Sequence, residues 1–425
     1  MKILYICHRI PYPPNKGDKI RSFNEVKYLA ENHDLYLAFL VDDPADVKNV
    51  DPLRKYCVDL AWEEVDPRQQ KIKAAPHMLL GKPLSLPYFY SSSLQRKIDQ
   101  WAGAVDFDAV VCFSGPMAEY VFKSNTLKRE SGKAPRLVMD FCDVDSDKWG
   151  QFSREGKFPM NIVYGLEQKR LLAYEAKVNR EFDCSILVTE NEAHLFKTLV
   201  PEARNVEVVG NGVDFKFFNP EAVPGNTVDT TIDGPTSASP QTGDHRDDAP
   251  RTEPMHLVFT GAMDYHANVD AVTWFCRDIL PIIRESGIDV EFYIVGGRPT
   301  PAVKALEQVP GVTVTGFVDD IRTWYAQADV CVLPMRLGRG VQNKVLEAMA
   351  MQRPVVTTTK AAEGVSAKDL QHLLVADSPE DIARSVIELC KNPNARTQLG
   401  EAGRTFVTEN FDWKRNMEKL EELLK

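Results

Sequence analysis

Basic, acidic and glycine residues that could bind a phosphate-containing ligand gather between positions 336 and 347. They are Arg336, Gly338, Arg339, Gly340, Lys344 and Glu347. An apolar run precedes them, and a helix is expected to begin near Val341 or Gln342. A helix N-terminus favours an anion through its dipole and its unpaired N–H groups, and nearby cations add to this effect. The segment therefore predicts a diphosphate site.

Glu347 adds a second ligand group to the same helix. It follows Lys344 by three residues, so both side chains can face one side. A carboxylate placed there can accept hydrogen bonds from the two hydroxyls of a ribose. The alternative is an ordinary amphipathic helix with solvated charges, but the glycines, cations and apolar face together favour a nucleotide diphosphate.

The elements that must position these residues alternate between short apolar runs and helical patterns. In the first half, strands are expected at 3–7, 35–41, 58–65, 109–113, 137–141, 185–188 and 206–209, and helices at about 18–32, 160–182 and 191–199. In the second half, strands are expected at 257–260, 290–295, 312–315, 330–333 and 355–357, and helices at 268–285, 341–351 and 379–391. This alternation predicts an α/β chain with two Rossmann-like parallel sheets. Ligands bind such sheets at the carboxyl ends of the strands.

A break at residues 221–254 separates the two halves. It is rich in Pro, Gly, Thr, Ser and Asp and nearly empty of large apolar residues, which predicts a flexible linker. The expected domains are therefore 1–220 and 255–410. A terminal helix at 411–425 is expected to pack back on the first domain.

Composition limits the class of protein. The 425 residues carry a formal net charge of −10, which argues against nucleic acid as the main partner. The eight cysteines form no C-x-x-C pair and several lie in apolar runs, so they predict buried thiols rather than disulfides or a zinc site. No apolar stretch reaches eighteen residues. We expect a cytoplasmic protein.

The segment NKVLEAMAMQRPVV at 343–356 resembles the donor-binding motif of the retaining glycosyltransferase family 4, the glycosyl transferases group 1. That family has the GT-B fold, in which two Rossmann-like domains with parallel sheets face each other across a cleft. Its motif holds two glutamates separated by seven residues. The second matches Glu347, which the resemblance assigns to the donor ribose. The first, which in the family contacts the transferred sugar, falls on Arg339. This departure puts the sugar contact in doubt, and Arg339 is expected to bind the diphosphate instead. The resemblance also places Gly340 and Asn343 among the donor-binding residues.

Other segments extend the resemblance over nearly the whole chain. NGVD at 211–214 is similar to the family's domain junction, VFTGAMD at 258–264 to the first strand of the donor domain, and residues 316–320 to the base-binding loop. Within VFTGAMD, Gly261 would let the donor approach the backbone. Three segments, at 8–30, 141–149 and 339–351, look like the sugar transferases of the PEP-CTERM/exosortase system.

The first half is expected to hold the acceptor. In the family, the loop that here spans residues 13–21 folds over the donor phosphates and the acceptor. Gly17 would give close backbone approach, and Lys19 and Arg21 would offer charge on the acceptor side. The alternative is a proline-rich surface loop with solvated cations.

A run of carboxylates at 140–147 follows a predicted strand. Asp143 and Asp145 match a D-x-D metal pattern, but such triplets are common and GT-B enzymes use no metal at the donor, so we expect none. We interpret these two aspartates as catalytic candidates that orient or deprotonate an acceptor hydroxyl. Glu347, the expected ribose ligand, is the third catalytic candidate. A helix N-cap cluster is the equal alternative. His8 and His266 are expected to be structural or solvated.

The resemblance thus implies a metal-independent hexosyltransferase without a cofactor that acts with retention in exopolysaccharide synthesis. Its partners would be a nucleotide sugar and a lipid-linked saccharide, with peripheral contact at the inner membrane face. An epimerase of the same fold and a degenerate binding scaffold remain alternatives. Arg339 is the best support for the scaffold.

Overall fold

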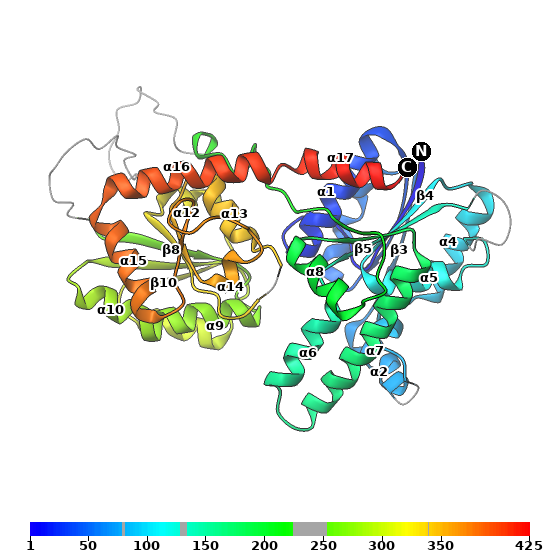
Figure 1. The fold of residues 1–425 in the computed structure, drawn as a ribbon, viewed down its shortest axis with the longest axis horizontal. Coiled ribbons are helices and arrows are strands. Elements are labelled where there is room, and N and C mark those ends of the chain that lie inside the picture. Colours follow the sequence, from blue (N-terminus) through cyan, green and yellow to red (C-terminus); the bar gives the residue numbers. More distant parts are fainter. Residues whose placement is uncertain (79–80, 128–133, 224–252, 339) are drawn as a thin grey trace. The chain divides into compact units, whose positions relative to one another are not determined.

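The computed structural model describes residues 1–78, 81–127, 134–223, 253–338 and 340–425. The chain forms two compact units (Figure 1). The first unit comprises Met1–Asn211 and Trp413–Lys425, and the second comprises Gly212–Asp412. Residues 212–220, which we expected in the first domain, belong to the second unit. Most of the predicted linker, residues 224–252, lies outside the described part.

The first unit is built on a seven-stranded parallel sheet of order β3-β2-β1-β4-β5-β6-β7. Its strands are β1 (Lys2–Cys7), β2 (Asp34–Val41), β3 (Asp59–Glu64), β4 (Ala109–Phe113), β5 (Arg136–Cys142), β6 (Cys184–Leu187) and β7 (Val206–Val208). Their apolar runs are almost wholly buried, as expected for a parallel sheet covered on both faces. Because β1 pairs in parallel with β4, and β4 with β5, the loops that follow these strands share one edge.

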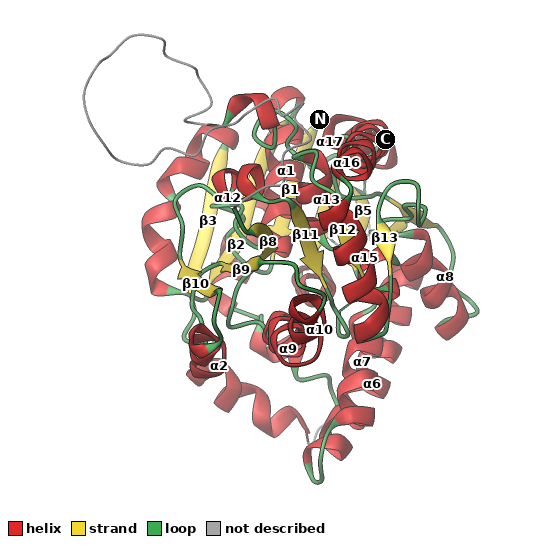
Figure 2. Ribbon diagram, turned by 90° about the vertical axis from the view of Figure 1, so that its left-hand side faces the viewer, coloured by secondary structure: helices red, strands yellow, loops and turns green. Residues whose placement is uncertain are grey.

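Helices cover both faces of this sheet (Figures 1 and 2). They are α1 (Gly17–Asn32), α2 (Pro67–Ala74), α3 (Ser85–Tyr88), α4 (Ser92–Ala104), α5 (Ala118–Lys123), α6 (Asp145–Glu155), α7 (Met160–Glu181), α8 (Glu190–Leu199) and α17 (Trp413–Leu423). Short 3₁₀ turns occupy Pro44–Asn49, Asp51–Tyr56, Ala75–Met78 and Gly115–Met117. The pair α6 and α7 projects from the sheet as a long hairpin (Figure 1).

The terminal helix α17 packs on α1 within the first unit. Met417 and Leu420 are buried in the core on one face of the sheet. Tyr28 of α1 donates a hydrogen bond to Glu421, at 3.2 Å. The contacts place the last helix with the first unit.

The second unit holds a six-stranded parallel sheet of order β10-β9-β8-β11-β12-β13. Its strands are β8 (Met255–Thr260), β9 (Val290–Val295), β10 (Val312–Gly316), β11 (Val330–Leu333), β12 (Val355–Thr357) and β13 (Leu374–Val375). The strand order reverses direction between β8 and β11. Such a switch point is where open α/β sheets bind ligands.

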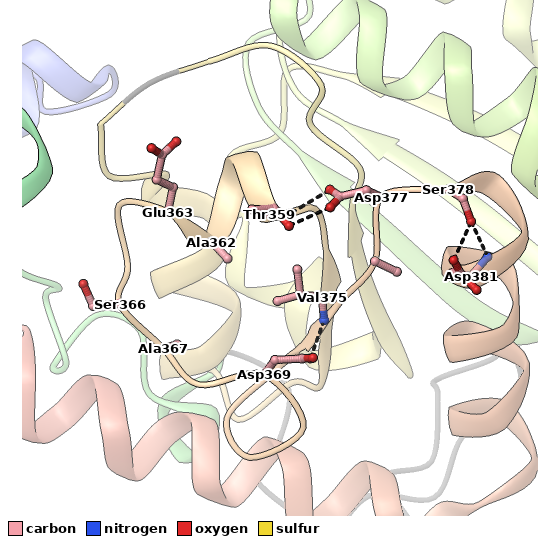
Figure 3. Close-up of a pocket in the computed structure, with 11 residues that line it drawn as sticks. Thr359, Ala362, Glu363, Ser366, Ala367, Asp369, Val375, Asp377, Ser378 and Asp381 are labelled. Atoms are coloured by element: carbon pink, nitrogen blue, oxygen red, sulfur yellow. Dashed lines mark hydrogen bonds between the residues drawn. The ribbon is translucent and has the colours of Figure 1, made fainter.

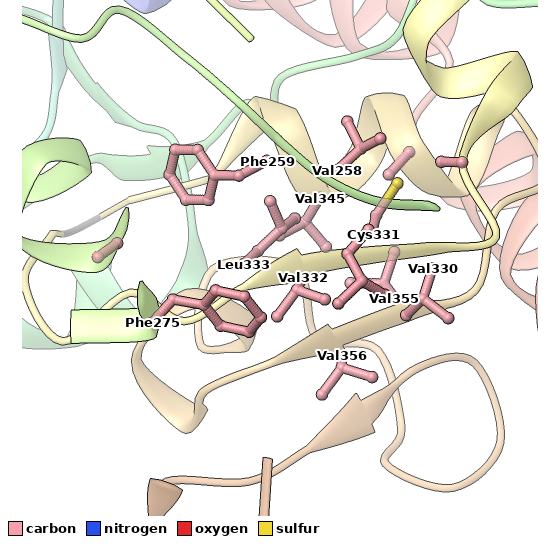
Figure 4. Packing of buried hydrophobic residues seen from close by; sticks show 14 of the residues in the cluster. Val258, Phe259, Phe275, Val330, Cys331, Val332, Leu333, Val345, Val355 and Val356 are labelled. Carbon is pink, nitrogen blue, oxygen red and sulfur yellow. The ribbon is translucent and has the colours of Figure 1, made fainter. Parts of the chain in front are cut away.

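Helices of the second unit follow its strands in turn. They are α9 (His266–Trp274), α10 (Leu280–Glu285), α11 (Pro301–Lys304), α12 (Arg322–Gln327), α13 (Asn343–Ala350), α14 (Thr359–Ala362), α15 (Pro379–Lys391) and α16 (Pro393–Asn410), with a π-helical turn at Phe275–Ile279 and 3₁₀ turns at Pro220–Ala222 and Ala305–Gln308. Figure 4 shows the core between them, where Phe259, Phe275, Leu333 and Val345 pack across β8 and β11. This packing fixes the start of α13 against the sheet.

No helix in the described ranges is long and apolar enough to cross a membrane.

Candidate functional site

Two glycines shape the switch point of the second unit. Gly261 directly follows β8 and Gly296 directly follows β9, with φ of +154° and +151°. A Cβ on Gly296 would lie 1.7 Å from the carbonyl oxygen of Gly261, so no other residue fits there. A Cβ on Gly261 would lie 2.6 Å from Asn268 Nδ2 and 3.3 Å from Lys344 Nζ. Glycine at 261 therefore makes room for Asn268 of α9 and for Lys344 at the start of α13.

Lys344 lies beside this glycine with few polar partners. Its ammonium donates a hydrogen bond to Asn268 Oδ1 and lies 3.7 Å from Met335 Sδ. It also lies 4.7 Å from the centre of the Phe259 ring. Burial lowers the pKa of Lys344 to about 7, although the charge of Glu347 acts in the opposite direction. Near neutral pH this lysine is only partly protonated, and an anion bound beside it would raise its pKa and favour the charged form.

Glu347 is held by the hydroxyl of Tyr325, which in turn contacts Thr260, and sequence reasoning missed both residues. Tyr325 donates a hydrogen bond to Glu347 Oε2 at 3.0 Å, and its hydroxyl lies 2.7 Å from Thr260 Oγ1. Burial raises the pKa of Glu347, whereas Tyr325 and Lys344 lower it. Thr260 ends the predicted strand and could have been noticed there. Tyr325 lies in the short helix α12, RTWYAQ, where nothing in the sequence marks it as a site residue.

The turn before α13 differs from the predicted cation cluster. Arg336 donates to Asp270 Oδ2 from Nε at 3.0 Å and lies over the Trp274 ring at 4.8 Å. Its charge is therefore paired with a carboxylate of α9, and its role at the diphosphate stays a prediction. Arg339 lies outside the described residues. Gly340 has φ of +64°, a left-handed conformation that favours glycine.

Asn343 is the first residue of α13. Its Oδ1 is buried and accepts no hydrogen bond from any part of the chain that the structure describes. A buried acceptor without a partner costs about 1–3 kcal/mol. Such an atom at this helix start is suited to accept a hydrogen bond from a ligand.

The carboxylates at the edge of the first sheet are not equivalent. Asp145 begins α6, and its carboxylate accepts a hydrogen bond from Lys148 Nζ at 3.0 Å. Asp143 Oδ1 is buried and without a hydrogen-bond partner among the described residues. Burial raises the pKa of Asp143, and Lys148 lowers it. A proton acceptor at this edge is therefore better placed at Asp143 than at Asp145.

The predicted acceptor-side cations point into the first unit. Lys19 is 3% exposed, and its Nζ lies 2.6 Å from Asp46 Oδ2. Arg21 is fully buried and donates to Asp140 Oδ2 from Nε and Nη2, at 2.8 and 2.6 Å. Both cations are thus buried in ion pairs within the first unit, Lys19 with the 3₁₀ turn Pro44–Asn49 and Arg21 with β5, and their acceptor-side role stays a prediction. Gly17, by contrast, is the exposed first residue of α1.

His8 is less isolated than expected. It follows β1, lies 5.6 Å from the Phe113 ring, and brings Nε2 to 3.5 Å from Asp18 Oδ2. Burial lowers the pKa of His8, but the hydrogen bond with Asp18 more than compensates and the pKa is about 9. His8 is therefore a buried cation paired with a carboxylate. His266 begins α9.

A separate hollow of about 770 Å³ lies beside β13 (Figure 3). Its carboxylates are already engaged. Asp377 accepts from the backbone and hydroxyl of Thr359, at 2.9 and 2.6 Å, and Asp369 accepts from the backbone of Val375 at 2.8 Å. None of the predicted site residues lines it. We assign it no ligand.

Residues 254–392, about a third of the chain, match the family described as glycosyl transferases group 1. This segment is similar to that family. It contains the switch-point glycines, Lys344, Glu347 and Tyr325. The enzyme class that the match supports is a glycosyltransferase.

Similarity over the full length comes from more distant proteins. A Klebsiella pneumoniae protein described as an uncharacterized 44.6 kDa protein in the cps region is 21% identical over 97% of both chains. Sucrose-phosphate synthase from Thermosynechococcus elongatus has a TM-score of 0.68 at 15% identity, covering 100% of this chain and 98% of that one. Anabaena HepE, in a complex with UDP-glucose, has a TM-score of 0.62 at 14% identity, with 100% and 99% covered.

These structural likenesses confirm the fold class. Both units are Rossmann-like, with parallel sheets of seven and six strands, in agreement with the GT-B fold. At identities of 15% and below, they establish the fold and nothing about substrates.

Proposed function

We propose that the protein transfers a sugar from a nucleoside diphosphate sugar to a saccharide acceptor, with retention and without a metal. The observation that carries the proposal is the arrangement of Lys344, Asn343 and Glu347 at the start of α13, beside Gly261 at the switch point. A cation, an unpaired acceptor and a fixed carboxylate lie where an open α/β sheet binds its ligand. The UDP-glucose complex of HepE supports a nucleotide sugar as the donor.

In the proposed reaction, the diphosphate leaves toward the start of α13. Lys344, once protonated, and the positive end of the helix dipole stabilise the negative charge that develops on the leaving group. Glu347, held by Tyr325, accepts hydrogen bonds from the ribose hydroxyls. These interactions position the donor and strengthen as the sugar–phosphate bond breaks.

The acceptor is assigned to the first unit. Asp143, with its buried unpaired oxygen, is proposed to orient the acceptor hydroxyl. The acceptor hydroxyl loses its proton to an oxygen of the leaving phosphate. The hydroxyl oxygen attacks the anomeric carbon of the sugar from the face that the diphosphate leaves. Asp145, paired with Lys148, has a supporting role at the start of α6.

The proposed pathway is exopolysaccharide synthesis with a lipid-linked acceptor at a membrane surface. The relative from the cps region of K. pneumoniae, similar over 97% of both chains, supports this setting. Arg339 in place of the family's first glutamate favours one alternative, a binding scaffold without transfer. Hydrolysis of the donor by the purified protein separates the two, because a scaffold would bind the nucleotide sugar and leave it intact.

The test is a thermal-shift screen of the full chain against UDP, GDP and their common sugars. Binding to the folded state raises the melting temperature by mass action. We expect a rise with one nucleotide that disappears in Glu347→Ala and persists in Glu388→Ala, an exposed glutamate of α15 in the same unit. A folded protein that responds to none of these nucleotides would contradict the proposed function.

A further inference from the structure

Exposed apolar side chains gather at the end of the α6–α7 hairpin. Five of the eleven large hydrophobic residues that are exposed in the described structure lie within residues 152–166, which we call the hairpin tip. They are Phe152, Phe158, Met160, Ile162 and Leu166, with Phe158 79% exposed and Ile162 54% exposed. Scattered exposed apolar residues are normal, but a contiguous group marks an interaction surface.

Aromatic rings support this surface from within the hairpin. Trp149, Phe152 and Tyr164 pack together, with ring centroids 5.6 to 6.0 Å apart. Phe152 and Trp149 come from α6 and Tyr164 from α7, so the rings join the two helices. The hairpin projects away from the sheet and its tip is a free end (Figures 1 and 2). Rigid aromatic residues at an exposed end are typical of surfaces that enter the interface of a bilayer.

Basic residues border the tip although the chain is acidic overall. Residues 152–170 hold four basic and two acidic residues, and one of the acidic ones, Glu167, is buried. Residues 67–83 hold four basic and no acidic residues, against a net charge of −10 for the chain. Glu167 accepts hydrogen bonds from the backbone of Leu84 at 2.7 and 2.9 Å, which ties this basic segment to α7. Both α2 and the tip extend from the same end of the first unit in both views.

We propose that the hairpin tip inserts its apolar side chains into the surface of a bilayer that contains anionic lipids, with the basic residues of α2 and the hairpin at the headgroups. Apolar insertion and cationic attraction act together in such binding. The proposal rests on the proposed function in one respect, because a lipid-linked acceptor would lie at this surface. Helix α6 spans about 16 Å from its start, next to Asp143, to the tip. The candidate catalytic edge would then lie close to the lipid headgroups.

The charge pattern favours a bilayer over a second copy of the chain. A symmetric dimer through the tip would bring together the basic residues that border the tip in each copy, and like charges across an interface are unfavourable. Anionic headgroups neutralise the same residues.

The experiment is sedimentation of the full chain with vesicles of phosphatidylcholine and phosphatidylglycerol in equal parts, and of phosphatidylcholine alone. We expect binding to the mixed vesicles that weakens with added salt. Two variants, Phe158→Ser with Ile162→Ser, and Lys71→Glu with Lys157→Glu, should each weaken binding about tenfold or more. The matched control is Val58→Ser, 58% exposed at the amino end of β3, at the opposite end of the sheet from α6, and it should bind as the wild type does.

Three results would overturn the proposal. They are a wild type that stays in solution with both vesicles, an apolar variant that binds undiminished, and a dimer in analytical ultracentrifugation that this variant abolishes. The nucleotide response is measured on the same samples and should be unchanged in all three variants. Loss of vesicle binding with an intact nucleotide response leaves the proposed function standing. Vesicle binding without any nucleotide response would count against the proposed function alone.

Discussion

Binding of the nucleotide should carry a proton into the protein through Lys344. The pKa of Lys344 is about 7 because its ammonium is buried beside Met335 and Phe259, with Asn268 as its hydrogen-bond partner. A diphosphate placed there restores the charged form. At about pH 8 roughly 0.9 of the lysine is uncharged, so about 0.9 proton should be taken up per nucleotide, falling to about 0.5 at about pH 7.

Isothermal titration calorimetry measures this uptake directly. The apparent binding enthalpy is recorded in buffers of different ionisation enthalpy, and its slope gives the number of protons bound. Lys344→Met should lose the uptake at about pH 8, whereas Lys304→Met, an exposed lysine of α11, should keep it. Equal uptake in the wild type and Lys344→Met would refute the reasoning.

A second measurement tests the same lysine without nucleotide. The folded-state pKa lies below the ordinary value of 10.5, so the unfolded chain holds more protons between about pH 7 and pH 10. Stability therefore rises with pH in that window. Relative to Lys344→Met, the wild type should gain about 2 kcal/mol of unfolding free energy from about pH 7 to pH 9. If the difference in unfolding free energy between the wild type and Lys344→Met does not change with pH, the lysine is charged in the folded protein.

Three further substitutions test the framework of the site. Tyr325→Phe removes the hydroxyl that holds Glu347 and should cost about 1–3 kcal/mol of unfolding free energy. It should also reduce the preference for UDP over 2′-deoxy-UDP in calorimetry, or for GDP over its deoxy form, because the carboxylate is no longer fixed. Arg21→Met leaves Asp140 buried and unpaired and should cost about 3–5 kcal/mol in denaturant unfolding. Gly296→Ala forces the two switch-point turns apart and should lower both the melting temperature and nucleotide affinity.

Matched substitutions show whether these effects are specific. Lys27→Met changes an exposed residue of α1 and should alter stability by less than about 0.5 kcal/mol. Gly103→Ala lies in α4 with open space around it and should be neutral or stabilising. A Tyr325→Phe protein that melts earlier but keeps its ribose preference would assign the hydroxyl a purely structural role.

The strands could be predicted from the sequence because parallel strands are buried on both faces and appear as unbroken apolar runs. Val330–Leu333 and Ala109–Phe113 were found in this way. Helix α16 was not, because Gly400 and Gly403 weaken its helical pattern. Both are buried, and a Cβ on either would contact a backbone carbonyl, at 2.4 and 2.9 Å. Close packing, rather than helix propensity, explains these glycines.

The site could be predicted only in part. The glycine turn and helix start at 338–343 are local in sequence, so their spacing indicates a ligand site. The partners of the charged residues are distant. Arg21 pairs with Asp140, 119 positions away, and Arg336 with Asp270, 66 positions away. A basic residue in a sequence looks solvated until such a partner is known, and this is why the sequence does not predict that Lys19 and Arg21 are buried.

The return of α17 to the first unit affects how the chain folds during synthesis. The first unit is interrupted after Asn211 and resumes at Trp413, so the whole second unit is an insertion within it. On a ribosome, the second unit emerges complete while the first still lacks Met417 and Leu420 of its core. Until then, the part of this core that packs against them stays uncovered. The unit that begins first is therefore finished last, and its uncovered apolar surface is a natural binding site for chaperones during synthesis.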